Sequence, residues 1–255
     1  MIHFVGAGCG AKDLITIRGK EHIEKADVIV YAGSLVNKEL LDYNTKGAKC
    51  YDSAYLDLNE IMDILIDAEN SGKYVVRLHT GDPALYGAIK EQMDVLDEND
   101  ITYDVTPGVS AAFGAAASLK AEYTLPSISQ TLILTRMSGK TKVPERESIK
   151  SLASHKATMA VYLSASLVEE LQKELLEGGY SKDTPVAICK KVSWEDEEIF
   201  RCTVGTLAET SRSKNITKTC IYIIGDSIDP KEFEKSCLYD SDFSTEYRQG
   251  KSDDI

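Results

Sequence analysis

Apolar residues recur along the chain in two alternating patterns, which predict strands followed by helices. Short runs rich in β-branched residues, such as Ile2–Val5, Val28–Tyr31 and Tyr74–Leu78, are typical of buried parallel strands. Between Asp57 and Asn70 the apolar residues instead recur at helical spacing, which indicates a helix with one buried face. Strands that alternate with helices in this way predict an α/β protein with a parallel sheet.

The second half of the chain repeats this alternation with one difference. Strands are expected over Leu132–Leu134, Thr158–Leu163, Val186–Cys189, Ile199–Val204 and Thr219–Ile224. The acidic turn Trp194–Glu198 joins two of them with hairpin-like spacing, so we expect an antiparallel component and a mixed sheet. The crossing between halves falls near residues 119–129, and the hydrophobic pattern fades after Asp229. We therefore predict two α/β domains and a polar, acidic tail, over residues 1–118, 119–229 and 230–255.

The loop Gly81-Asp82-Pro83 separates a strand from the helical pattern that follows it. Gly81 permits a tight turn or the close approach of main chain to a ligand, and Asp82 stands where an N-cap acceptor belongs. Pro83 fits the first position of a helix that extends to about Asn99. Such a loop offers backbone N–H groups at the carboxyl end of a strand, where open α/β sheets bind ligands. The same residues would also suit a capped connection that binds nothing.

Charge and cysteine usage narrow the class of protein. The net charge of -12 argues against a nucleic-acid partner and against anionic membranes. We find no signal peptide and no apolar run long enough to span a bilayer, so we expect a cytoplasmic protein. The six cysteines show neither a C-x-x-C pair nor zinc-like spacing, which predicts free thiols in a reducing compartment and no metal site.

The sequence shows little material for catalysis by side chains alone. It contains no G-x-S-x-G, H-E-x-x-H or Walker A sequence and only four histidines. This favours an enzyme that holds a reactive cofactor against a substrate. The loop Gly6–Ala11 satisfies G-x-G-x-x-G/A and Asp27 follows it near the right spacing, which would suit a nicotinamide-dependent oxidoreductase. However, the next helix is expected only from Thr16 or Ile17 to Lys25, too late for a nucleotide fingerprint.

Five motifs in a fixed order, between about Ile2 and Asp229, carry a resemblance to a known family. They are Gly6-Ala7-Gly8-x-Gly10 with Asp13–Thr16, Tyr31-Ala32-Gly33-Ser34-Leu35-Val36, His79–Ile89, Pro107-Gly108-Val109-Ser110, and Ile133–Arg136 followed by Val143-Pro144-Glu145. Together they resemble the tetrapyrrole (corrin/porphyrin) methyltransferases. Within this family they are most similar to members that methylate C-11 of a corrin precursor in cobalamin biosynthesis.

The resemblance implies a cofactor, a substrate class and an assembly. It implies S-adenosylmethionine as methyl donor and S-adenosylhomocysteine as product, bound in a cleft between two α/β domains. It also implies an anionic tetrapyrrole substrate and a homodimer. Carried over by matching position, the cofactor residues are Cys9, Gly81, Asp82, Leu85, Ser110, Ala111, Leu163 and Val192.

For the reaction itself we expect an electron-rich ring carbon to attack the sulfonium methyl group directly. The substrate carries many carboxylates, and one segment contains four cations that could form charge-assisted hydrogen bonds with them. They are Arg136, Lys140, Lys142 and Arg146. A solvated loop would show the same charges. His79 is a candidate for proton handling, although a loop histidine bonded to main chain would look the same.

The chain departs from the family pattern in two places. The first loop usually reads Gly-x-Gly-Pro-Gly-Asp-Pro, and here Cys9, Ala11 and Lys12 replace both prolines and the acid. Members that act on uroporphyrinogen carry an aspartate at or next to Gly33, and its absence speaks against that substrate and leaves no evident general base. Methylation of another tetrapyrrole or ring position, and a non-catalytic tetrapyrrole carrier, remain alternatives.

Overall fold

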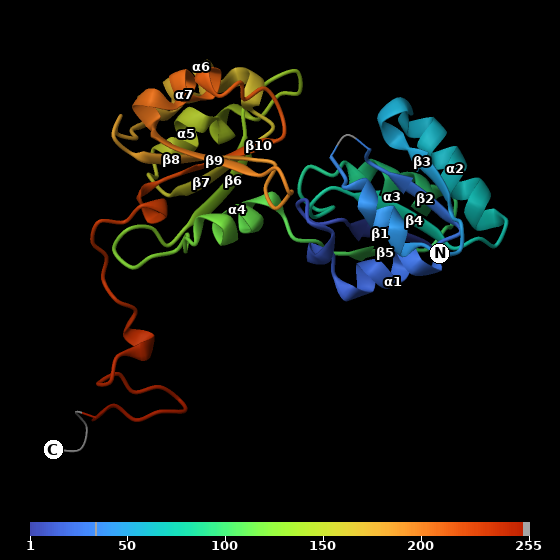
Figure 1. Cartoon of the computed structure of the whole chain (residues 1–255), viewed down its shortest axis with the longest axis horizontal. Helices are drawn as coiled ribbons and strands as arrows, with labels where there is room; N and C mark the ends of the chain where they lie inside the picture. The colour runs from blue at the N-terminus through green and yellow to red at the C-terminus, as the bar shows by residue number, and fades with distance from the viewer. Residues whose placement is uncertain (34, 252–255) are drawn as a thin grey trace. The chain divides into compact units, whose positions relative to one another are not determined.

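The computed structural model describes residues 1–33 and 35–251, which form two compact units (Figure 1). The first unit contains Met1–Ser118, Cys189–Ile199 and Lys218–Ile221, and the second contains Leu119–Ile188, Phe200–Thr217 and the chain from Tyr222 onward. The sequence predicts a single division after residue 118. In the structure the segment 189–199, from the second half of the sequence, belongs to the first unit. Ser34 of the predicted turn and residues 252–255 of the predicted tail lie outside the described residues.

The first unit is built on a five-stranded sheet in the order β3-β2-β4-β1-β5, in which each neighbouring pair runs parallel. Its strands are β1 (Ile2–Gly6), β2 (Val28–Tyr31), β3 (Lys49–Asp52), β4 (Val75–His79) and β5 (Tyr103–Thr106). Because the strands are parallel, their carboxyl ends meet at one edge, which we call the carboxyl edge. The loops after β1, β4 and β5 are neighbours there, since these three strands are adjacent.

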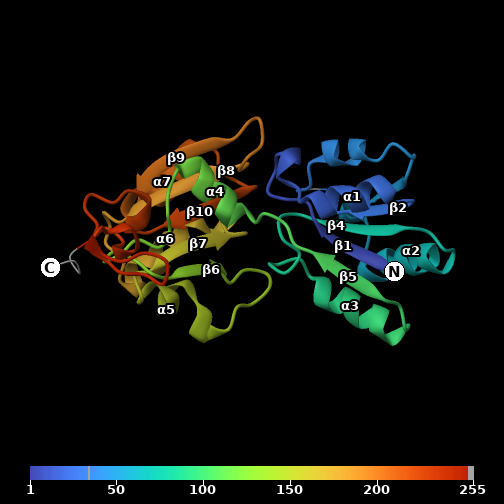
Figure 2. The same cartoon turned by 90° about the horizontal axis from the view of Figure 1, so that it is seen from below.

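Helices cover both faces of this sheet (Figure 2). They are α1 (Ile17–Lys25), α2 (Leu58–Asn70) and α3 (Ile89–Glu98), with short 3-10 turns that include η2 (Lys38–Tyr43) and η3 (Ser53–Tyr55). Helix α4 (Ala111–Leu119) follows β5. On one face Ile23 of α1 belongs to a buried cluster with Val5 and Leu78. On the other, Leu65 of α2 is buried in a cluster with Phe4. Alternate residues of β1 therefore contribute to opposite cores, as the pleat of a strand requires.

Two predicted helix starts are confirmed and a third is wrong. α1 begins after Thr16, whose hydroxyl accepts a hydrogen bond from Gly19 N at 3.0 Å, and α2 begins after a capping box at Asp57. Asp82, by contrast, does not cap a helix, because residues 83–86 form a turn and α3 starts only at Ile89. Tyr86 (φ 58°) and Ala88 (φ 50°) are left-handed, which interrupts a helix.

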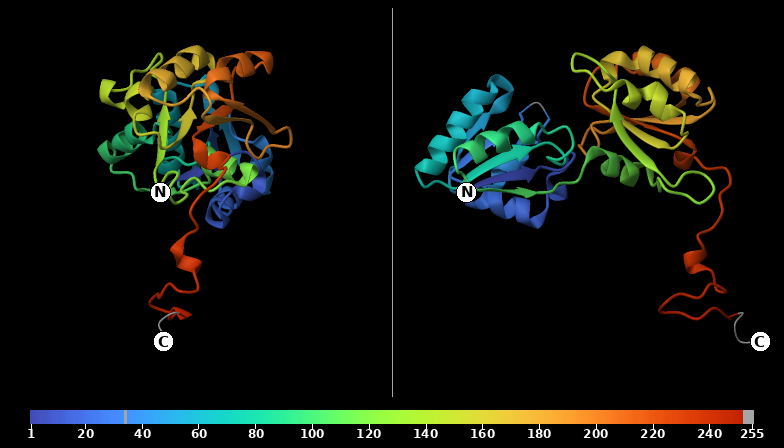
Figure 3. Two further views of the ribbon diagram at one scale, coloured as in Figure 1. Left: turned by 90° about the vertical axis from the view of Figure 1, so that its left-hand side faces the viewer. Right: turned by 180° about the vertical axis from the view of Figure 1, so that it is seen from behind.

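The second unit contains the sheet β6-β7-β10-β8-β9. Its strands are β6 (Leu132–Arg136), β7 (Thr158–Tyr162), β8 (Pro185–Lys190), β9 (Glu198–Thr203) and β10 (Cys220–Ile224). β6 and β7 pair parallel whereas β7 and β10 pair antiparallel, which confirms the predicted mixed sheet and the α/β class. Helices α5 (Ile149–Ala153), α6 (Val168–Gly178) and α7 (Leu207–Ser213) lie along one face (Figure 3).

The described part of the tail, residues 230–251, is largely exposed. It contains one short 3-10 turn, η8 (Cys237–Tyr239). Among the described residues, no helix combines the length and the apolar composition needed to cross a bilayer. The six cysteines are all free thiols.

Candidate functional site

Three glycines bring the loops after β1, β4 and β5 into direct main-chain contact. A Cβ on Gly108 would lie 2.1 Å from the carbonyl oxygen of Gly81, and a Cβ on Gly6 would lie 2.6 Å from the nitrogen of Gly108. Gly8 and Gly81 also form a bridge, in which Gly81 N donates to Gly8 O at 2.8 Å. No side chain fits between these main chains, so the loops at the carboxyl edge present mostly backbone atoms.

Asp82 fastens the loop after β4 to the loop after β5. Its Oδ2 accepts a hydrogen bond from Gly108 N at 3.0 Å, and its Oδ1 accepts one from Ala84 N at 2.8 Å. Gly81 has a φ of 61°, and a Cβ there would stand 3.7 Å from the Cα of Ser110. Of the predicted cofactor residues, Gly81, Asp82 and Ser110 thus lie together. Ala111 follows as the first residue of α4, and Leu85 lies in the turn held by Asp82, donating its N–H to Asp82 O at 3.2 Å.

The segment 189–199 closes over the first glycine loop. The Oγ of Ser193 accepts a hydrogen bond from Ala11 N at 3.0 Å and lies 3.3 Å from the Sγ of Cys9. A Cβ on Gly114 of α4 would come within 2.6 Å of that sulfur and 2.7 Å of Cγ1 of Val192. The structure therefore brings Cys9 and Val192, two predicted cofactor residues, to one point. Burial raises the pKa of the Cys9 thiol, so it is a neutral packing group rather than a nucleophile.

Sequence reasoning missed the residues that hold this segment in place. Glu197 accepts hydrogen bonds from the hydroxyl of Ser118 at 2.9 Å and from Ser193 N. Trp194 stands over Gly10, where a Cβ would be 2.3 Å from the indole Cδ1. From the sequence, the acidic turn Trp194–Glu198 indicates only a hairpin connection. The one sequence signal that this turn also contacts the first glycine loop is the family resemblance, which assigns Val192 to the cofactor site.

Two buried hydroxyls at the carboxyl edge have no hydrogen-bond partner among the described residues. They are the Oγ1 atoms of Thr80, directly after β4, and of Thr106, the last residue of β5. Buried polar atoms are normally paired, and each unpaired one calls for an explanation. A bound molecule with polar atoms would supply the missing partners. The site therefore fits a cofactor that is held by main-chain groups and a few hydroxyls, and sequence reasoning identified neither threonine.

His79, the predicted proton-handling residue, is the last residue of β4 and is 3 % exposed. Burial, together with the neighbouring Arg77 guanidinium, lowers the pKa of its imidazole to about 3. The ring is neutral at physiological pH and a weak proton acceptor there. Arg77 is itself buried, and it donates to Gln92 Oε1 at 3.1 Å and to Val30 O at 3.2 Å. The catalytic assignment of His79 stays a prediction, and its burial favours a packing role.

Leu163, the remaining predicted cofactor residue, belongs to the second unit. It directly follows β7 with a left-handed φ of 52°. Its side chain is 64 % exposed, which is unusual for a large apolar residue in a folded unit. Its assignment to the cofactor stays a prediction.

The four predicted substrate-binding cations do not share one environment. The guanidinium of Arg136 donates to the carbonyl oxygens of Met137, Thr141 and Lys142 at 3.1, 3.0 and 3.3 Å, so it closes its own loop. Arg146 pairs with Glu147 at 3.4 Å and is 86 % exposed. Lys140 and Lys142 are exposed. The lysines are therefore the better candidates for contact with an anionic ligand.

Two other features of the first unit lie away from these loops. His3 and His22 stack with ring centroids 4.2 Å apart, and Asp104 Oδ1 is 2.9 Å from His3 Nδ1. The potential ligand atoms of these three residues lie within 4.8 Å of one another. However, stacked rings direct their in-plane nitrogen lone pairs side by side and not toward a common ion. We therefore assign the group to packing.

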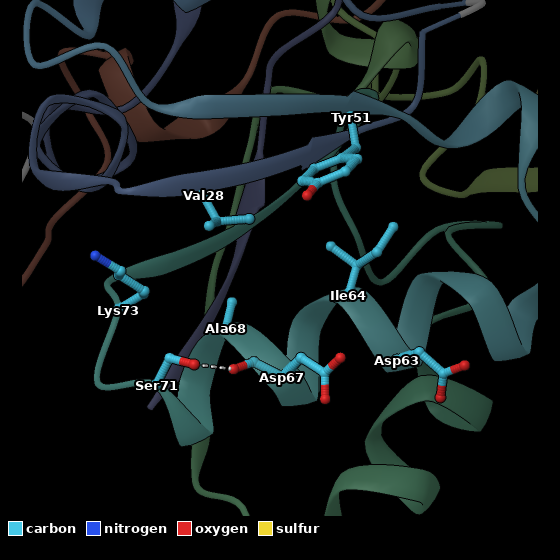
Figure 4. Close-up of a pocket in the computed structure, with 8 residues that line it drawn as sticks. All are labelled: Val28, Tyr51, Asp63, Ile64, Asp67, Ala68, Ser71 and Lys73. Carbon is cyan, nitrogen blue, oxygen red and sulfur yellow. Dashed lines mark hydrogen bonds between the residues drawn. The ribbon is translucent and has the colours of Figure 1, made fainter.

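The second feature is a hollow of about 330 Å³ beside α2 (Figure 4). Its lining residues are Val28, Tyr51, Asp63, Ile64, Asp67, Ala68, Ser71 and Lys73. Val28 begins β2 and Lys73 precedes β4, so the hollow reaches toward the amino ends of these strands. Ligands of parallel sheets bind at the carboxyl ends. None of the predicted site residues lines it.

The chain has a parallel sheet whose carboxyl edge is lined mostly by main-chain atoms, and a second unit with a mixed sheet. These features are typical of two-unit α/β proteins that bind a small ligand at the carboxyl ends of their strands. The family model described as Tetrapyrrole (Corrin/Porphyrin) Methylases matches residues 1–208. The chain belongs to this family of methyltransferases, which confirms the resemblance drawn from its motifs.

Individual relatives agree with this membership. A cobalt-precorrin-4 C(11)-methyltransferase from Methanocaldococcus jannaschii is 52% identical over 245 residues, which cover 96% of this chain and 95% of the relative. The X-ray structure of a cobalt precorrin-4 methyltransferase, CbiF, matches with a TM-score of 0.87 at 43% identity, covering 90% of this chain and 96% of the other. A uroporphyrin-III C-methyl transferase from Thermus thermophilus, solved with S-adenyl homocysteine, has a TM-score of 0.75 at 20% identity, covering 89% and 98% of the two chains, and shows a shared fold.

Proposed function

We propose that this protein transfers a methyl group from S-adenosylmethionine to C-11 of cobalt-precorrin-4 in cobalamin biosynthesis. The observation that carries the proposal is the 52% identity, over nearly the full length, to a relative named for this activity. The name of the 43% identical solved structure supports the same substrate. The cobalt-containing substrate is preferred to cobalt-free precorrin-4 on these two names.

The residues at the carboxyl edge suit S-adenosylmethionine, whose sulfonium group supplies an activated methyl. We infer that the main chain around Gly81 and Ser110 holds the cofactor and that the hydroxyls of Thr80 and Thr106 bond to its polar atoms. Cys9, Val192, Leu85 and Ala111 would form less polar walls, and Leu163 is proposed to contribute from the second unit. Apolar walls around a sulfonium favour a transition state in which its positive charge is lost.

We propose that Lys140 and Lys142 bind carboxylates of the tetrapyrrole. Both lysines are exposed, whereas Arg136 is occupied by its own loop. Exposed ammonium groups can form charge-assisted hydrogen bonds with carboxylates. Reversing both charges with Lys140→Glu and Lys142→Glu should raise KM for the tetrapyrrole and leave S-adenosylhomocysteine affinity unchanged. Lys46→Glu, at another exposed lysine, is the control, and an unchanged KM in the double variant would contradict the assignment.

We further propose that the protein works in the cytoplasm as a homodimer without a nucleic-acid or membrane partner. The net charge of -12 supports the last two points, and the homodimer rests on the family resemblance. Light scattering of the purified chain tests the dimer, since a monomer at working concentration would contradict it.

The decisive experiment is a methyl-transfer assay with S-adenosylmethionine and precorrin-4, with and without cobalt, read by mass spectrometry as the gain of one methyl group. Calorimetric titration with S-adenosylhomocysteine and, separately, with NAD tests the cofactor. Thr80→Val and Thr106→Val should each weaken S-adenosylhomocysteine binding by about 2- to 10-fold, because each removes one neutral hydrogen bond. Ser211→Ala is the control, because it removes a buried hydroxyl of the second unit that also has no partner in the described part of the chain. Binding of NAD alone would contradict the methyltransferase proposal.

A further inference from the structure

The carboxylate of Asp52 stands where a side chain of residue 33 would project. Asp52 is the last residue of β3, and Tyr31, its partner in the parallel register, is the last residue of β2. Gly33 follows β2 at the carboxyl edge. A Cβ built on Gly33 would lie 2.0 Å from each carboxylate oxygen of Asp52. The two positions therefore compete for one volume, and in this chain Asp52 fills it.

The surroundings hold this carboxylate in place and leave part of it accessible. Oδ1 of Asp52 accepts a hydrogen bond from Ala54 N at 3.0 Å. The hydroxyl of Ser53 donates to Tyr31 O at 3.1 Å, which ties the end of β3 to β2. The other oxygen, Oδ2, lies 3.7 Å from the Nζ of Lys38. The Asp52 side chain is 19% exposed and the Lys38 side chain 63% exposed, so this pair can be reached from solvent.

The other acidic and basic groups described above are less suited to take a proton. Both oxygens of Asp82 already accept main-chain hydrogen bonds. Glu197 is bonded to Ser118 and Ser193. His79 is buried, and its Nε2 has no hydrogen-bond partner within residues 1–33 and 35–251. Asp52 combines a fixed position, a partly exposed side chain and contact with Gly33, in the loop after β2, the strand next to β4 in the sheet.

We propose that Asp52 is a catalytic residue that faces the tetrapyrrole and accepts the proton released on methylation. This inference rests on the proposed function. In the reaction a C–C bond forms with an electron pair of the macrocycle, and the S–CH3 bond breaks with its pair left on sulfur. The methyl group arrives as a cation equivalent, so a neutral macrocycle must lose one proton. The Asp52 carboxylate takes that proton, becomes a carboxylic acid, and returns the proton to solvent through its exposed side.

Asp52→Asn separates this role from a structural one. The amide oxygen can still accept from Ala54 N, so the local turn is kept while the negative charge and the proton-accepting group are lost. We expect kcat to fall by about 10²-fold or more, the usual contribution of a general base. Affinity for S-adenosylhomocysteine should stay unchanged. Retained kcat in this variant would overturn the proposal.

Lys38→Met tests whether Asp52 acts only by holding Lys38. This change removes the ammonium group near Oδ2 and leaves the carboxylate in place. We expect Lys38→Met to keep most of the parent kcat. If it reproduces the full loss seen in Asp52→Asn, the ion pair and not the carboxylate carries the effect, and the proposal fails.

A relocated carboxylate gives the sharpest test. Asp52→Ala empties the volume beside Gly33, and the backbone of Gly33 is not left-handed, so an L side chain is allowed there. The double variant Gly33→Asp/Asp52→Ala should recover at least about ten-fold in kcat over Asp52→Ala alone, a part of the contribution of a general base. Gly33→Asn/Asp52→Ala is the matched control and should recover nothing. Equal rates in the two double variants would overturn the proposal.

The outcomes also separate this inference from the proposed function. If the parent protein binds S-adenosylhomocysteine and methylates precorrin-4, the function stands and the Asp52 variants alone decide the inference. If the folded parent neither binds S-adenosylhomocysteine nor methylates either form of precorrin-4, the proposed function is wrong and the role of Asp52 falls with it.

Discussion

Replacing Gly108 by alanine should disrupt the cofactor site through a single methyl group. The added Cβ would lie 2.1 Å from the carbonyl oxygen of Gly81 and 2.9 Å from the Cα of Gly6. Ordinary contact begins at 3.4 Å, so the Gly81 carbonyl and the new methyl must separate by about 1.3 Å. Main chain lies on each side of the clash, and neither group can move by a simple side-chain rotation.

The expected losses of stability and activity follow from the packing and the hydrogen bond that this shift disrupts. Overpacking of a filled site costs about 1–3 kcal/mol. Moving the loop also strains the bond from Gly108 N to Asp82, a charge-assisted hydrogen bond worth about 1.5–3 kcal/mol. We expect a loss of about 2–4 kcal/mol in the free energy of unfolding of the first unit. A displacement of about 1 Å in a positioned site can also cost about 10²-fold in activity, and S-adenosylhomocysteine affinity should fall steeply.

Denaturant unfolding and calorimetric titration with S-adenosylhomocysteine measure the two effects. Gly139→Ala is the control, because its Cβ would meet only the end of the Leu167 side chain at 3.3 Å. Both variants gain the same stabilisation from a less flexible unfolded chain, so their difference isolates the clash. Parent-like stability and parent-like binding in Gly108→Ala would refute the close packing of these loops.

Two further predictions concern the buried polar groups around β4. The pKa of His79 is about 3 in the folded protein and about 6.5 when unfolded. Between these values the unfolded chain binds a proton that the native state does not. The free energy of unfolding should therefore fall as pH drops from 6.5 toward 3, by up to about 1.4 kcal/mol per pH unit. His79→Asn should flatten that slope in acid denaturation, and an unchanged slope would contradict the burial. Gln92→Leu should cost about 1–3 kcal/mol, because Arg77 Nε loses its partner. The exposed Gln130→Leu should change stability by less than about 0.5 kcal/mol, and similar losses in both variants would contradict this reasoning.

Local patterns predicted most elements because the forces that form them act over a few residues. Strand β4 follows from its apolar run, and α2 follows from helical spacing after the Asp57 capping box. The same reasoning failed after Asp82. Its carboxylate prefers Gly108 N on another loop, and the left-handed residues Tyr86 and Ala88 delay the helix to Ile89. A neighbour distant in sequence outweighed a local helix signal.

The motifs together identified the family and predicted Gly81, Asp82 and Ser110 as cofactor residues, and the structure brings these three residues together at the carboxyl edge. Thr80 and Thr106 were not predicted, because one buried hydroxyl without a partner cannot be recognised until burial is known. The sequence by itself therefore determined the order of strands and helices, the mixed second sheet and the family. Only the tertiary structure decided that Ser193 reaches Cys9 across 184 positions and that Asp52 occupies the place beside Gly33. Such contacts depend on the order of the strands in the sheet. That order is established only when segments distant in sequence pack together.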